Sequence, residues 1–169
     1  FTLSAEEFAA FYLRFKEVGD KKKVVYDDDL SALVEDSMYV AQETYTLDYI
    51  HVTCGSTTVP TATVRLKKGS ETLQDSSTGN GAVDAAMQAI DRIVKRSGNL
   101  AQYSVEAVTH GRDSLGEVTL KVDFGNGDLI TGKGASTDVI EASARAYINA
   151  VNRAEMLHGR RLAMAAAPI

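Results

Sequence analysis

Two glycine-rich segments contain the residues of this chain that are best suited to binding a small ligand. They are Gly79-Asn80-Gly81-Ala82-Val83-Asp84 and Gly132-Lys133-Gly134-Ala135-Ser136-Thr137-Asp138, and each precedes a segment of helical periodicity. Glycine lets the backbone approach a ligand, and the free amides at a helix start favour a carboxylate. Asp84 and Asp138 are placed to oppose an ammonium group. Because small residues surround them, we predict a pocket for a free amino acid with a branched aliphatic side chain.

A plainer interpretation explains the same residues about equally well. Glycines commonly end strands, and aspartates commonly cap helices without binding any ligand. The residues alone leave both interpretations open.

The sequence gives little support for metal binding, phosphate binding or catalysis. The three histidines, His51, His110 and His158, lie on separate predicted elements without neighbouring metal-ligating residues, so we predict no metal site. The span from Gly127 to Lys133 resembles a phosphate-binding loop, but Gly134 stands where the magnesium-binding Ser or Thr belongs. We predict no catalytic residues.

The composition narrows the classes of partner. The chain has 169 residues, of which 44% are hydrophobic, and its 18 Lys and Arg against 23 Asp and Glu give a net charge of −5. This acidic balance argues against nucleic acid and anionic membranes as partners. No apolar run reaches bilayer length, and the N-terminus has no signal-like pattern. With Cys54 as the single cysteine, we expect a cytoplasmic protein in which Cys54 is buried in a strand.

The chain contains an internal repeat. An offset of 54 residues carries Asp84 onto Asp138, and it relates three further pairs: Tyr49 and Tyr103, Val64 and Val118, and Leu66 and Leu120. A unit this small buries its apolar face only against a neighbour. We therefore predict that the two glycine turns face one another.

Hydrophobic periodicity predicts the same order of elements in both repeats. Alternating apolar residues indicate strands, and apolar residues at three- and four-residue spacing indicate helices. The fold class is α+β, with two tandem pseudo-symmetric βββα modules of antiparallel strands covered by helices. We expect strands at 47–53, 61–67, 71–77, 103–109, 117–124 and 129–132, and helices from 82 to about 97 and from 138 to about 152.

The modules occupy 47–98 and 99–152 of a regulatory domain at 47–152. A capping box at Ser4-Ala5-Glu6-Glu7 begins a predicted helix, and a short helical linker subdomain is expected at 1–46. The remaining residues, 153–169, form a C-terminal extension that we expect to fray.

Several of these segments together resemble a known family. They are Gly79-Asn80-Gly81-Ala82-Val83-Asp84-Ala85, the stretch from Tyr103 to Gly111-Arg112-Asp113-Ser114-Leu115-Gly116, and the segment from Gly134 to Ser143. The chain is similar to the C-terminal regulatory domain of 2-isopropylmalate synthase over roughly residues 1–153. The segment 20–27 resembles the linker that precedes that domain. Ala82 stands where many members of that family have proline.

This resemblance implies a regulatory function. Members of that family condense acetyl-CoA with 2-oxoisovalerate in leucine biosynthesis, using a divalent metal in a TIM barrel that is missing from this chain. The resemblance implies that this part binds L-leucine between its modules, needs no cofactor of its own, forms a homodimer, and passes feedback inhibition to the catalytic barrel of the same polypeptide.

The resemblance also implies which residues contact leucine. The family's pocket positions fall on Val83, Asp84, Leu100, Tyr103, Ala107, Arg112, Gly116, Ala135 and Thr137. Gly79, Asn80, Gly81, Ala82 and Asp138 complete the predicted site from the glycine turns.

Three alternatives remain at this point. The first is the related domain of citramalate synthase, which senses isoleucine. The second is a stand-alone amino-acid-binding dimerisation module. The third is an RNA-binding domain of α-β-β-β-α type, which the acidic balance disfavours.

Overall fold

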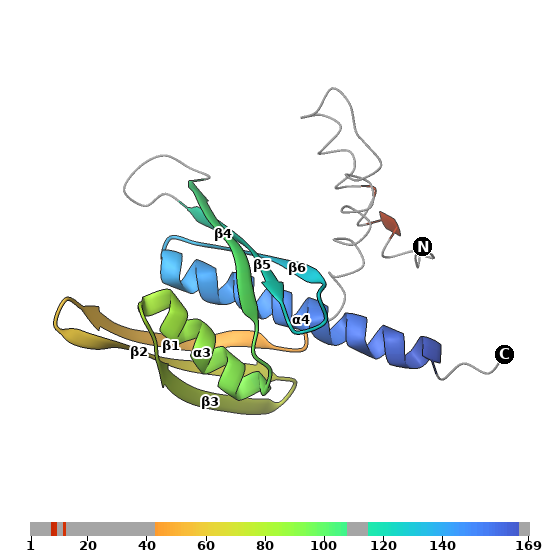
Figure 1. Ribbon diagram of the computed structural model, residues 1–169, viewed down its shortest axis with the longest axis horizontal. Helices are drawn as coiled ribbons and strands as arrows, with labels where there is room; N and C mark the ends of the chain where they lie inside the picture. Colours follow the sequence, from red (N-terminus) through yellow and green to blue (C-terminus); the bar gives the residue numbers. More distant parts are fainter. Residues whose placement is uncertain (1–7, 10–11, 13–42, 108–114, 166–169) are drawn as a thin grey trace, which may run out of the picture. The chain divides into compact units, whose positions relative to one another are not determined.

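The computed structural model describes residues 8–9, 12, 43–107 and 115–165 (Figure 1). The chain forms two compact units, Phe1–Glu43 and Thr44–Ile169. In the first unit residues 8–9 and 12 are helical, and Phe8 and Tyr12 are exposed. The rest of the predicted linker subdomain lies outside the described residues, so that subdomain stays a prediction.

The second unit consists of two βββα modules, as the sequence predicts. Each module has a three-stranded antiparallel sheet, in the orders β1-β2-β3 and β4-β5-β6. The first module contains β1 (Thr46–Gly55), β2 (Thr58–Lys68), β3 (Glu71–Thr78) and α3 (Ala82–Val94). The second contains β4 (Asn99–Ala107), β5 (Gly116–Asp123), β6 (Leu129–Ser136) and α4 (Val139–Ala165).

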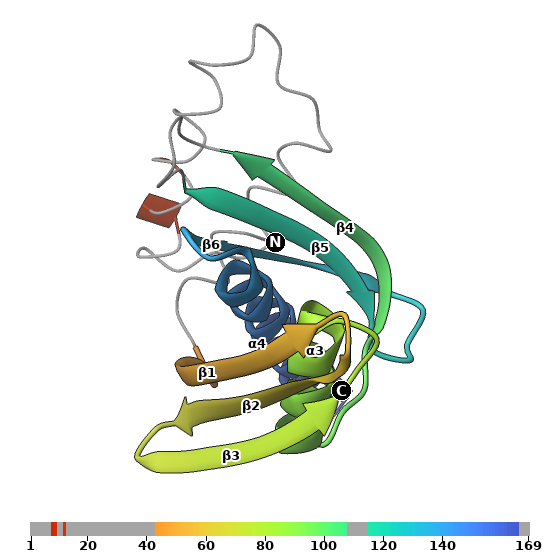
Figure 2. The same cartoon turned by 90° about the vertical axis from the view of Figure 1, so that its left-hand side faces the viewer.

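The two helices lie between the two sheets, as Figure 2 shows. The middle strand of each sheet supplies alternate apolar residues to one shared core, because successive side chains in a strand point to opposite faces. The predicted apolar face of β5 is confirmed: Val118, Leu120 and Val122 are fully buried, and Phe124 beyond the strand is nearly so. Tyr147 on α4 is the largest fully buried side chain.

The repeat is less regular than a constant offset of 54 residues. That offset holds for the middle strands, where Val64 and Val118 are both buried. It fails on the first strands, because Tyr49 pairs with Arg65 on the outer face, whereas Tyr103 pairs with Leu120 on the inner face. When the offset of 54 is applied, the pairing of β4 with β5 differs by one residue from the pairing of β1 with β2, and a one-residue shift moves a side chain to the other face.

The second predicted glycine turn is wrong, because Gly132 and Gly134 lie within β6. An ideal Cβ on Gly132 would overlap the backbone of Ala146, and one on Gly134 would overlap the backbone of Ala142 and Ala146. These glycines therefore allow the backbone of α4 to pack directly on the sheet.

Two other expectations are corrected. Helix α4 continues to Ala165 instead of fraying after Asn152. Ala154 remains buried, so apolar contact continues along the helix past its predicted end. Cys54 lies in a strand, but its side chain is exposed.

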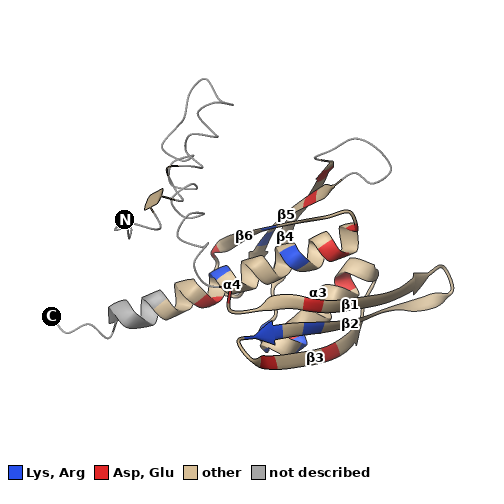
Figure 3. Ribbon diagram, turned by 180° about the vertical axis from the view of Figure 1, so that it is seen from behind, with Lys and Arg blue, Asp and Glu red and all other residues tan. Residues whose placement is uncertain are grey.

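The outer face of the first sheet is polar, and Figure 3 shows acidic and basic residues beside one another on β1 and β2. Asp48 lies 2.7 Å from the Lys67 ammonium and 3.6 Å from the Arg65 guanidinium. These exposed pairs each contribute little to stability.

The close approach of β6 to α4 predicts a sharp difference between two glycine substitutions. Gly134→Ala places a methyl group against the α4 backbone, and overpacking of this kind costs about 2–3 kcal/mol of folding free energy. The control is Gly116→Ala on β5, where the nearest atom to the new methyl is the Ser136 carbonyl oxygen at 3.6 Å. Urea unfolding measures both. Equal midpoints for the two variants would contradict the packing described.

Candidate functional site

The first glycine turn is built as a compact start to α3. The Gly79 amide donates to the Pro60 carbonyl at 3.0 Å, which fastens the turn to β2. An ideal Cβ on Gly79 would overlap the Ala85 amide nitrogen and lie 2.7 Å from Asp84 Oδ2, so only glycine fits. The same Asp84 oxygen accepts a hydrogen bond from the Asn80 amide at 2.7 Å. Asp84 therefore holds the turn against the helix.

Gly81 has a different role, as the N-cap residue of α3. Its backbone is extended, and no side chain caps the helix from this position. A Cβ at Gly81 would meet nothing within 4 Å. The first amides of α3, which have no partners within the helix, therefore receive no cap from this position.

A groove of about 550 Å³ runs between α3 and the start of β4. This volume lies in the range of about 300–1,000 Å³ typical of small-ligand sites. The groove brings together four of the predicted site residues, Val83, Asp84, Leu100 and Tyr103. Its other lining residues are Met87, Gln88, Asp91, Gly98, Asn99 and Tyr147.

Tyr103 connects the groove to α4. Its hydroxyl oxygen lies 2.7 Å from the hydroxyl oxygen of Ser143, which is fully buried. The Ser143 hydroxyl also donates to the Val139 carbonyl at 2.6 Å. The ring of Tyr103 is thereby tied to the first turn of α4.

A second hydroxyl closes the far end of the groove. Tyr147, which is 1% exposed, donates to Asp91 Oδ1 at 2.6 Å and accepts a hydrogen bond from the Gly98 amide at 3.1 Å. A Cβ on Gly98 would lie 2.5 Å from the Tyr147 hydroxyl oxygen, so glycine is needed here for close approach. Burial raises the pKa of Asp91 to about 6, with a smaller contribution from the charge of Asp84.

The remaining predicted residues do not line this groove. Gly79, Asn80, Gly81 and Ala82 form the turn that leads into it. Ala107, Gly116 and Ala135 lie together at one end of the second sheet, where Ala107 pairs with Gly116 and Ala135 pairs with Glu117. Thr137 and Asp138 follow β6, and Arg112 lies outside the described residues.

Asp138 is not the structural counterpart of Asp84. It precedes α4, where its Oδ1 accepts hydrogen bonds from the Ile140 amide at 2.7 Å and the Glu141 amide at 3.3 Å. Its carbonyl accepts the Ala142 amide, just as the Gly81 carbonyl accepts the Ala85 amide. Asp138 therefore matches Gly81 and acts as a helix cap. The two helices do begin at the same end of the unit (Figures 1 and 2).

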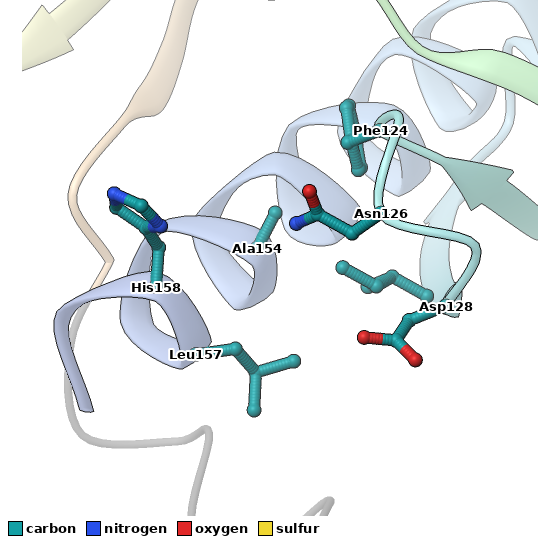
Figure 4. Close-up of a pocket in the computed structure, with 7 residues that line it drawn as sticks. Phe124, Asn126, Asp128, Ala154, Leu157 and His158 are labelled. Carbon is teal, nitrogen blue, oxygen red and sulfur yellow. The ribbon is translucent and has the colours of Figure 1, made fainter. Parts of the chain in front are cut away.

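Other hollows in the described residues are less suited to an amino acid. One, between the β5–β6 turn and α4, is drawn in Figure 4 with Phe124, Asn126 and His158. It holds about 10 Å³, which is room for at most one water molecule. Another, of about 370 Å³, lies at the end of α3, where Arg92 pairs with Asp75 and Arg96 with Glu155.

The residues that the structure describes show neither a metal-binding cluster nor a membrane-spanning helix. They contain no group of three or more His, Cys, Asp or Glu side chains placed to hold a metal ion. None of their helices is long and apolar enough to span a membrane.

Comparison with known proteins decides the family. The sequence profile of the LeuA allosteric (dimerisation) domain matches residues 24–155. The chain belongs to this family. The chain is 54% identical over 154 residues to 2-isopropylmalate synthase of Methylacidiphilum infernorum and 48% identical over 153 residues to that of Carboxydothermus hydrogenoformans. These alignments cover 91% and 90% of the chain, but only 30% of each relative. The chain is thus an allosteric domain and corresponds to less than a third of those enzymes.

Sequence reasoning missed the part of the allosteric domain's groove farthest from the glycine turn. Gln88 follows Asp84 by four residues and Asp91 follows Gln88 by three, which places all three on one face of α3. Polar residues at this spacing beside an apolar stripe were the available signal. The contact of Asp91 with Tyr147 could not be predicted from a local sequence pattern, because 56 residues separate them.

The raised pKa of Asp91 predicts a pH-dependent stability. The folded state holds this proton more tightly than the unfolded state, whose pKa is near 3.8. The free energy of unfolding therefore falls as pH rises from about 4 to about 6, and then levels off. Since Asp91 is partly exposed, solvent screening reduces the effect to about 1 kcal/mol.

The test compares wild type with Asp91→Asn, which keeps an acceptor for Tyr147 but cannot titrate. Urea unfolding from pH 4 to 7 should show the wild type losing stability relative to the variant. Two other carboxyl groups have lowered pKa values, Asp48 through its hydrogen bond to Lys67 and Asp75 through its hydrogen bond from the Ser76 amide. Their effect on the free energy of unfolding has the opposite sign and occurs below about pH 4. Parallel profiles for the two proteins would refute the assignment.

Proposed function

We propose that this allosteric domain binds L-leucine in the groove between α3 and β4. The observation that carries the proposal is that apolar side chains and an acidic group at the start of α3 line the same groove. Val83, Met87 and Leu100 offer contacts for an aliphatic side chain. Asp84 lies at the helix start, where it supplies a negative charge for an ammonium group.

The carboxylate of leucine is assigned to the start of α3. A helix N-terminus favours an anion through its free amides and the aligned peptide dipoles. Gly81 leaves this position open, since it contributes no capping side chain and no steric barrier. An α-amino acid carries its two charged groups on one carbon, so both would bind near the first turn of α3.

The relatives supply the biological setting. They are 2-isopropylmalate synthases, and leucine is the end product of the pathway that such an enzyme begins. We infer that this chain belongs to a polypeptide whose other part condenses acetyl-CoA with 2-oxoisovalerate at a divalent metal. Leucine inhibits that reaction only if it binds one arrangement of the domain more tightly than another. The predicted linker, 1–46, would transmit the change.

A second part of the proposal concerns the homodimer. Strand β4 carries an exposed apolar face, on which Leu100 is 40% exposed, Tyr103 is 37% exposed and Val105 is 45% exposed. These residues point to the same side as the buried partners with which they pair on β5. An apolar strand left uncovered in this way fits a protein–protein contact. Since Leu100 and Tyr103 also line the groove, a partner on β4 would lie beside the effector.

Leucine binding is tested with Gly81→Asp and its control Gly81→Ala. The new carboxylate caps α3, so the variant folds, but it occupies the amides that the effector carboxylate needs. Isothermal titration calorimetry should give leucine binding to wild type and to Gly81→Ala. Binding to Gly81→Asp should weaken by at least about tenfold, a change of about 1.4 kcal/mol. Equal leucine affinity in all three would count against the site, and tighter binding of isoleucine would reassign the effector.

The dimer is tested with Val105→Lys and the control Val59→Lys. Val59 is also exposed and apolar but lies on β2 of the other sheet. Analytical ultracentrifugation should show that Val105→Lys raises the dimer dissociation constant by at least about tenfold, because an unpaired charge is costly to bury. Val59→Lys should behave as wild type. A dimer unaffected by Val105→Lys would place the interface elsewhere.

A further inference from the structure

The hydrogen bonds between Tyr103 and α4 have a defined direction. The Ser143 hydroxyl has a single proton, and that proton goes to the Val139 carbonyl, because a carbonyl oxygen can only accept. Ser143 can therefore only accept from Tyr103. The Tyr103 hydroxyl donates its proton to Ser143. In any further hydrogen bond the Tyr103 oxygen can therefore only accept.

This direction determines what Tyr103 can recognise. Tyr103 lines the groove and its side chain is partly exposed, so the side chain can contact a bound molecule. As an acceptor it favours an N–H or O–H group and disfavours a carboxylate. Asp84 lines the same groove, and its Oδ2 already accepts the Asn80 amide and the Gln88 side-chain amide. An ammonium group near Asp84 would still need further acceptors.

We propose that Ser143 is a specificity-determining positioning residue, which orients the Tyr103 hydroxyl to accept a hydrogen bond from the ammonium group of the bound amino acid. The inference rests on the proposed function of the groove. Ser143 does not touch the ligand. It acts by being fully buried in the first turns of α4, where the Val139 carbonyl leaves its hydroxyl one possible orientation. The chemical class selected is an α-amino acid, as opposed to the corresponding carboxylic acid without the amino group.

The experiment measures selectivity, because a merely structural role would not change it. The ligands are leucine and 4-methylpentanoate, which is leucine without its amino group, and calorimetry gives the ratio of their affinities. The variants are Ser143→Ala, Tyr103→Phe and the double variant. Ser104→Ala is the control, since Ser104 lies on β4 beside Tyr103 but donates to the Thr119 carbonyl.

The preference for leucine should fall about tenfold in Tyr103→Phe and about threefold to tenfold in Ser143→Ala, as expected for a hydrogen bond to a charged group. The double variant should lose no more than Tyr103→Phe alone, because Ser143 acts through Tyr103. Ser104→Ala should keep the wild-type ratio. Alanine fits the buried helical site of Ser143, and the folding of each variant is checked by circular dichroism.

The failures are distinguishable. If leucine binds but Ser143→Ala keeps the wild-type ratio, or weakens both ligands equally, the role of Ser143 is overturned and the groove stands. If additive losses appear in the double variant, Ser143 acts by another route and the inference is likewise overturned. If wild type does not bind leucine, the proposed function fails and this inference fails with it.

Discussion

The buried hydroxyl of Tyr147 is the contact on which the arrangement of the two modules depends. From α4 it reaches Asp91 on α3 and the Gly98 amide ahead of β4, so one oxygen joins three elements. These elements are so close at Gly98 that a side chain there would collide with the Tyr147 hydroxyl. Because α3 and the start of β4 form the two walls of the groove, this contact also sets where the groove ends. Leaving a buried hydroxyl without partners would be costly, which favours this one packing of the helices.

The groove therefore belongs to both modules. Its first wall comes from α3, its second wall comes from β4, and Tyr103 and Tyr147 link both walls to α4. A ligand held there contacts elements whose relative positions define the domain. Such a site is suited to allosteric control, because a small change in the spacing of packed elements favours one arrangement over another. The carboxyl groups of Asp84 and Asp91 in the groove would favour a ligand that carries a positive charge.

The sequence predicted the βββα order of both modules and placed Val83, Asp84, Leu100 and Tyr103 together. Those predictions rest on periodicity and on a family resemblance, which the family match bears out. The errors arise where tertiary packing changes the local pattern. A one-residue difference in register between β1 and β4 places Tyr49 and Tyr103 on opposite faces. Gly132 and Gly134 serve helix packing instead of a turn. The role of Asp91 depends on a residue far along the chain, so no local pattern contains it.

Occupation of the groove between α3 and β4 by leucine can be followed residue by residue with NMR. Leucine is titrated into the ¹⁵N-labelled chain, and the amide shifts are followed in ¹H–¹⁵N spectra. If leucine binds in this groove, saturable shifts centre on Val83, Asp84, Leu100 and Tyr103. Shifts confined to the hollow beside Phe124 and His158, or no shifts at saturating leucine, would rule out this binding site.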